Sequence, residues 1–121
     1  MIRDVSDLEV YKISLELLKK LYDFLKSLPF SEYDTVLQCK RAGKSIPANI
    51  AEGYAKKHSE KEFKRFLQIA LGSSDELVTH LKVIAIIIPR LKDKSQILLD
   101  EYKNLSKKIN KLCSVWQNYS K

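Results

Sequence analysis

Apolar residues recur every three or four positions along most of the chain, which is the spacing of one face of an α-helix. The first regular series is Leu8, Tyr11, Leu15, Leu18, Tyr22 and Leu25. The last is Leu98, Tyr102, Leu105, Ile109, Leu112, Trp116 and Tyr119. Three glycines and three prolines in 121 residues leave few turn positions for a β-sheet fold. The spacing therefore predicts an all-α chain.

Four long segments have this spacing, and short connections separate them. Pro29 and Pro89 end the first and third segments, and the second runs from about Tyr33 to about Tyr54. The sequence Ser59-x-x-Glu62 is a capping box that starts the third. Short connections favour antiparallel neighbours. We expect residues 1–121 to form one domain, an antiparallel up-down four-helix bundle.

The first helix has a second apolar stripe beside the first. Its members are Val10, Leu17, Leu21, Phe24 and Leu28. Two apolar stripes are more than one helix of a small monomeric bundle needs. A wide core-facing sector would explain both of them. The alternative hypothesis is that the second stripe contacts a neighbouring subunit.

The segment Gln38–Gly53 has helical apolar spacing but contains a proline near its middle. Pro47 has no N–H and pushes against the carbonyl group four residues back, which belongs to Gly43. Gly43 lacks a Cβ, so the backbone can tilt away there. We therefore predict that this second helix is kinked at Pro47 and is not a loop.

Polar residues close to Pro47 could supply or relay the hydrogen bonds that a kink removes. Ser45, Asn49 and Glu52 all lie within two turns of it. We interpret Asn49 and Glu52 as structural residues that brace the kink. Gly53, near the end of the helix, suits a C-cap.

Segments distributed over nearly the whole chain have the pattern of a known family. They are Asp7-Leu-Glu-Val-Tyr11, Leu28-Pro-Phe30 with Glu32, Gln38–Gly53, Ser59-Glu-Lys-Glu-Phe63, Phe66-Leu67, Ala70-Leu-Gly-Ser73 and Glu76-Leu77. In these segments the chain resembles the 23S rRNA intervening-sequence proteins, which are small bacterial four-helix-bundle proteins. The accessory variability determinant proteins of diversity-generating retroelements look like relatives. Cys39 and Gly43 depart mildly from the pattern, since they replace an aliphatic residue and an alanine.

The resemblance implies a non-catalytic protein that associates with nucleic acid. It also implies a homo-oligomer, because the ring known in the family is a homopentamer. A second function class follows from the relatives that dock a reverse transcriptase. In that alternative the chain is a protein-interaction adaptor for a partner enzyme.

The chain is basic, with 22 Lys and Arg against 15 Asp and Glu and a net charge of +7. Two groups of basic residues are candidates for nucleic-acid binding. The first is Lys40, Arg41 and Lys44 on the second helix, and the second is Lys61, Lys64 and Arg65 at the start of the third. Such groups bind phosphates of RNA or DNA without reading sequence. A merely solvated face is the alternative for each group, and the sequence shows no aromatic stacking platform.

No catalytic, metal-binding or cofactor-binding constellation is recognisable. His58 and His80 are far apart, and Glu76 and His80 do not have the Glu-x-x-His spacing of di-iron bundles. There is no glycine-rich phosphate loop. We therefore expect a protein that is not an enzyme and that has no cofactor and no metal.

The location of the protein is also predicted from composition. The N-terminal residues are charged and lack the apolar core of a secretory signal. The longest apolar run, Val83–Ile88, is far too short to span a membrane. Cys39 and Cys113 lack metal-ligand spacing and suit a reducing compartment. We expect a cytoplasmic protein with no membrane partner.

Overall fold

The computed structural model describes residues 2–116, which form four α-helices and three short 3₁₀ turns. The helices are α1 (Glu9–Leu25), α2 (Tyr33–Ala55), α3 (Glu60–Ile87) and α4 (Lys92–Val115). The turns are η1 (Val5–Asp7), η2 (Phe30–Glu32) and η3 (Pro89–Leu91). No strand occurs within residues 2–116, so the predicted all-α four-helix class is confirmed. Tyr119, the last member of the predicted C-terminal series, lies outside the described residues.

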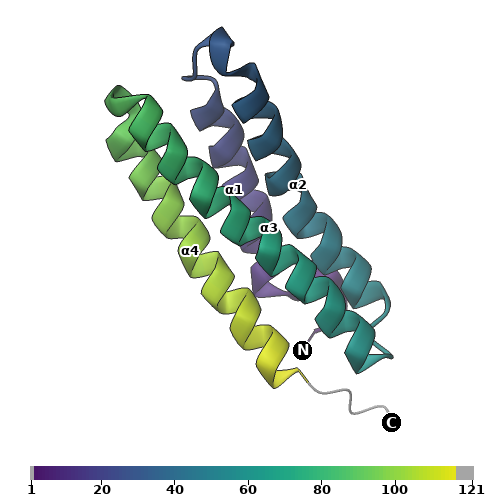
Figure 1. The fold of residues 1–121 in the computed structure, drawn as a ribbon. Coiled ribbons are helices and arrows are strands. Elements are labelled where there is room, and N and C mark those ends of the chain that lie inside the picture. The colour runs from purple at the N-terminus through teal and green to yellow at the C-terminus, as the bar shows by residue number, and fades with distance from the viewer. Residues whose placement is uncertain (1, 117–121) are drawn as a thin grey trace.

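Successive helices are joined at alternate ends of the bundle (Figure 1). The α1–α2 and α3–α4 connections lie at one end, and the α2–α3 connection lies at the other. Helix α2 packs against α1 and α3, and α4 packs against α3 and α1. One apolar core therefore runs lengthwise between all four helices.

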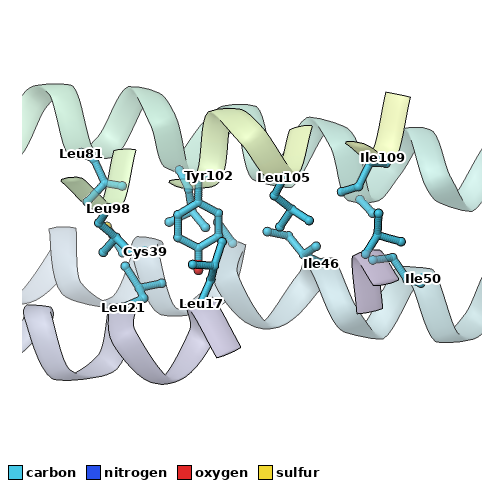
Figure 2. Packing of buried hydrophobic residues seen from close by; sticks show 14 of the residues in the cluster. Leu17, Leu21, Cys39, Ile46, Ile50, Leu81, Leu98, Tyr102, Leu105 and Ile109 are labelled. Atoms are coloured by element: carbon cyan, nitrogen blue, oxygen red, sulfur yellow. The ribbon is translucent and has the colours of Figure 1, made fainter. Parts of the chain in front are cut away.

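The centre of this core is formed by large side chains that are fully buried. Figure 2 shows the Tyr102 ring extending from α4 toward Leu17 and Leu21 on α1, near Cys39 of α2. Burial raises the pKa of the Cys39 thiol to about 12 and also raises the pKa of Tyr102. Cys39 therefore behaves as a small apolar group rather than as a reactive thiol.

The second apolar stripe of α1 faces this core. Its buried members are Val10, Leu17, Leu21 and Phe24. The first stripe is buried only at its two ends, Leu8 and Leu25, whereas Leu15 is 44% exposed. The subunit-interface hypothesis for the second stripe is therefore wrong. Both stripes have helical spacing, and the position of α1 between α2 and α4 decides which one is covered.

Two glycines of α2 allow neighbouring helices to approach closely. A Cβ atom at Gly43 would lie 2.7 Å from Leu21 Cδ2 of α1. One at Gly53 would lie 2.7 Å from Phe66 Cβ of α3. The predicted C-cap role of Gly53 is wrong, because α2 continues to Ala55. The position needs glycine because of the contact with α3.

Helix α2 continues through Pro47, whose side chain is buried. Beside it, Asn49 Nδ2 donates to the Ser45 carbonyl oxygen at 2.8 Å and to Ser45 Oγ at 2.9 Å. Ser45 Oγ also lies 2.8 Å from Ser73 Oγ on α3. Glu52 forms an ion pair with Lys56 at 3.4 Å. The bend at Pro47 and the bracing role of Asn49 and Glu52 stay predictions.

Candidate nucleic-acid interface

Lys40, Arg41 and Lys44 lie together on the outer side of α2. They line a hollow of about 430 Å³ whose other lining residues are Leu37, Ser45 and Ala48. Residues three and four apart share a helix face, so the sequence spacing brings these side chains together. Within residues 2–116 none of the three forms an ion pair with a carboxylate. We call these three residues the α2 basic face.

The α2 basic face meets an aromatic ring on α1. Lys40 Nζ lies 4.8 Å from the centroid of the half-buried Tyr22 ring, which is a cation–π arrangement. Tyr22 itself lines a larger hollow of about 950 Å³ along α1, together with Leu15, Leu18 and Lys19 among others. The Lys40–Tyr22 contact therefore connects two neighbouring hollows.

Sequence reasoning missed Tyr22 as part of this surface. Tyr22 and Lys40 belong to different helices, and no spacing rule relates them. Only the packing of α1 on α2 brings them together. The local series of apolar residues places Tyr22 on a helix face, but it does not show which basic residues lie opposite.

The second basic cluster, Lys61, Lys64 and Arg65, has a different electrostatic environment. Lys64 Nζ lies 3.0 Å from Glu60 Oε1. Arg65 Nε donates to Glu62 Oε2 at 2.9 Å, and Arg65 Nη2 donates to Glu62 Oε1 at 3.4 Å. These hydrogen bonds lower the pKa of Glu62 and raise that of Arg65. Two of the three positive charges are thus opposed by carboxylates.

The carboxylates have a local reason to be there. Glu60 and Glu62 lie in the first turn of α3, where negative charge is favourable beside the helix N-terminus. Ser59 Oγ accepts a hydrogen bond from the Glu62 backbone N–H at 3.2 Å, so the predicted start of this helix is confirmed. The i,i+3 and i,i+4 spacing of these pairs is a sequence signal that identifies them.

The two clusters lie at different positions along the length of the bundle. Gly53, which packs against Phe66 of α3, lies nine residues beyond Lys44 on α2. That separation corresponds to about 14 Å along the helix. The α2 basic face therefore lies near the middle of the bundle, and the second cluster lies at the end where α2 meets α3.

Across positions 2–116, no group of three or more His, Cys, Asp and Glu side chains could hold a metal ion. His80 Nε2 lies 3.0 Å from Glu76 Oε2 on the surface of α3. None of the helices in the described part of the chain is both long and apolar enough for a membrane crossing.

The family model of the 23S rRNA-intervening sequence proteins matches residues 6–111. No curated protein matches the sequence. The matched range includes α1, α2, α3 and most of α4. It contains Tyr22, the α2 basic face and the second basic cluster.

Proposed function

This chain belongs to the 23S rRNA-intervening sequence protein family, and on that premise we propose that it binds nucleic acid through the α2 basic face. The observation that supports the proposal is the absence of ion pairs at Lys40, Arg41 and Lys44 within residues 2–116. Phosphates bind basic side chains by displacing mobile counterions. A side chain already paired with a carboxylate would first have to give up that partner.

The proposed binding is non-catalytic and independent of base sequence, because its main contacts are to phosphates. RNA and DNA are both candidate ligands. The second cluster contributes chiefly through Lys61, which has no ion pair in the described structure. Lys64 and Arg65 would contribute only after separating from Glu60 and Glu62.

We further infer that the protein assembles into a homo-oligomer, with five copies as the number that the family resemblance implies. The observation in favour is an exposed apolar patch at the C-terminal end of α3. In the single chain Val83 is 42%, Ile86 76% and Ile87 47% exposed. Exposed apolar groups that lie together mark interaction surfaces. A ring would repeat the α2 basic face around one axis and add avidity to weak contacts.

The same apolar patch favours the second candidate function. In that alternative the chain is an adaptor whose patch docks a partner enzyme such as a reverse transcriptase. Docking on an apolar patch depends little on salt, whereas nucleic-acid binding weakens steeply as salt increases. Salt dependence therefore distinguishes the two functions.

The test of the main proposal is a salt titration of binding to labelled RNA and DNA of unrelated sequences. Reversing Lys40, Arg41 and Lys44 to Glu should weaken binding to all of them alike. Each lost phosphate contact should reduce the magnitude of the slope of log affinity against log salt by about 0.7–0.9.

A matched reversal on α4 is the control for net charge. Lys103, Lys107 and Lys111 are exposed and have no ion pair in the described structure, whereas Lys108 pairs with Glu9 at 2.7 Å. Equal losses from the α2 and α4 reversals would show that overall charge, not the α2 basic face, drives binding. No binding by the parent protein at low salt would refute the nucleic-acid proposal.

A further inference from the structure

Tyr22 adds an aromatic surface to a phosphate-binding face. Its ring is half-buried in α1, and Lys40 Nζ lies over it at 4.8 Å. Leu18 packs one turn earlier, with its Cδ1 only 3.0 Å from the position that a Cβ of Gly43 would occupy. The backbone of α1 that carries the Tyr22 ring is therefore packed closely against α2 at Gly43.

The space beside the ring suits a flat, partly apolar group. The hollow along α1 has a volume of about 950 Å³, within the range of small-molecule sites. Leu15 and Leu18 contribute apolar lining. Lys19, which lies three residues before Tyr22, lines the same hollow and forms no ion pair in the described part of the chain. Glu16 and Asp23 line the hollow as well, and Asp23 pairs with Lys26 at 3.7 Å. Basic side chains thus lie on both helices around the ring, with these two carboxylates among those on α1.

Single-stranded nucleic acid offers the complementary groups. Its unpaired bases expose faces that stack on aromatic rings, and its phosphates are bound by neighbouring lysines and arginines. In a duplex those faces are covered by adjacent base pairs, so it can offer this surface little beyond phosphates and groove edges. The cation–π contact of Lys40 with the half-buried ring is only partly shielded from water and is therefore modest in strength. Lys40 can therefore turn to a phosphate and leave the ring to a base.

We propose that Tyr22 stacks on an unpaired base while the α2 basic face binds the flanking phosphates. Single-stranded RNA or DNA is then the preferred ligand, and duplex binds more weakly. This inference rests on the proposed function, because it requires the α2 basic face to bind nucleic acid. It replaces the expectation from sequence that no aromatic stacking platform exists.

The experiment compares the parent protein with Tyr22→Ala, using a short labelled single strand and the duplex formed with its complement. Fluorescence anisotropy at constant low salt gives both affinities. The parent should prefer the single strand. Tyr22→Ala should lower its affinity for that strand by about 5- to 150-fold, the range found when a stacking aromatic is replaced by alanine, and leave duplex binding unchanged.

Two further variants make the result specific. Tyr33→Ala is the matched control, because Tyr33 is an exposed tyrosine of α2 that lies beside Phe30 and lines neither hollow; it should not alter either affinity. Tyr22→Phe keeps the ring face and should retain single-strand binding. If Tyr22→Ala fails to fold, Tyr22→Leu keeps an apolar side chain and removes the π-face.

The outcomes separate this inference from the function on which it rests. Equal losses for single strand and duplex would overturn the inference, since Tyr22 would then act by positioning Lys40. Unchanged single-strand binding by Tyr22→Ala would overturn it as well, while the α2 basic face could still bind phosphates. A parent protein that binds neither ligand would refute the proposed function and the inference together.

Discussion

The Asn49 side-chain amide donates to two atoms of Ser45, the carbonyl oxygen at 2.8 Å and the hydroxyl oxygen at 2.9 Å. Ser45 in turn contacts Ser73 on α3 at 2.8 Å. Asn49→Ala would remove both donor contacts in a partly buried site. We expect it to lower the free energy of unfolding by about 1–3 kcal/mol, as measured by chemical denaturation.

The control for this prediction is Asn104→Ala, because Asn104 is exposed on α4. It should change the free energy of unfolding by less than about 0.5 kcal/mol, as most surface substitutions do. An equally small effect of Asn49→Ala would contradict a structural role for Asn49. It would favour a direct role in ligand binding.

Gly53 and Gly72 should respond to alanine with opposite signs. A Cβ at Gly53 would lie 2.7 Å from Phe66 Cβ, an atom that cannot move without its backbone. Gly53→Ala should therefore destabilise the fold by about 1–3 kcal/mol through overpacking.

At Gly72 a Cβ would have no neighbour within 4 Å. Gly72→Ala should stabilise α3 by up to about 1 kcal/mol, because alanine has the higher helix propensity. Thermal or chemical denaturation of both variants measures the two changes. Shifts of the same sign would contradict the close packing of α2 on α3 at Gly53.

Removing the carboxylates of the second basic cluster should strengthen nucleic-acid binding. In the folded protein Glu60 pairs with Lys64, and Glu62 pairs with Arg65. The double variant Glu60→Gln/Glu62→Gln frees both cations while the helix remains capped by Ser59. Anisotropy titration should show a higher affinity and a steeper salt slope than the parent. An unchanged slope would show that this cluster does not reach the phosphates.

Acid should destabilise the protein through three surface carboxyl groups whose pKa values are lowered. Backbone N–H groups of Arg3 and Asp4 lower the pKa of Asp7, and Lys108 lowers that of Glu9. Arg65 lowers the pKa of Glu62. A carboxyl group whose pKa is lower in the folded state than in the unfolded state stabilises the fold at pH values above its unfolded-state pKa. This stabilisation is lost as the pH falls through the folded-state pKa.

The ordinary pKa values of these groups are 3.8 for Asp and 4.5 for Glu. The free energy of unfolding should therefore decrease as the pH falls from about 5 toward 3. Denaturation at a series of pH values checks the prediction. Asp7→Asn and Glu9→Gln should each flatten this decrease, and a parent profile without any decrease would contradict it.

The apolar patch on α3 should control assembly. Ile86→Glu places a charge on a side chain that is exposed in the single chain, so the fold should persist. An interface core does not tolerate an unpaired charge, and sedimentation should show smaller species than the parent. Ile97→Glu on α4, also exposed, is the control. A parent protein that sediments as a monomer would contradict the proposed oligomer.

The positions of the helices could be predicted because local signals determine them. The start of α3 follows from Ser59, whose hydroxyl accepts the Glu62 N–H, and Pro89 marks the end of the same helix. The buried face of α3 has the expected spacing, since Phe63, Leu67 and Ala70 are fully buried.

Features that depend on which helices become neighbours could not be predicted. Leu17 and Leu15 belong to equally regular stripes, but only Leu17 faces the core. The role of Gly53 depends on Phe66 of another helix. In the candidate site, the grouping of Lys40, Arg41 and Lys44 was readable from helical spacing, whereas the contact with Tyr22 required the packed structure.

Because Cys39 is buried, its thiol is unreactive as long as the bundle is closed. Its side chain has no exposed surface, and burial raises the pKa of its thiol to about 12. A thiol reagent needs both access and the thiolate form, so near neutral pH it can modify Cys39 only in molecules whose helices have separated. The labelling rate of Cys39 would therefore report how often the native bundle opens, without any denaturant.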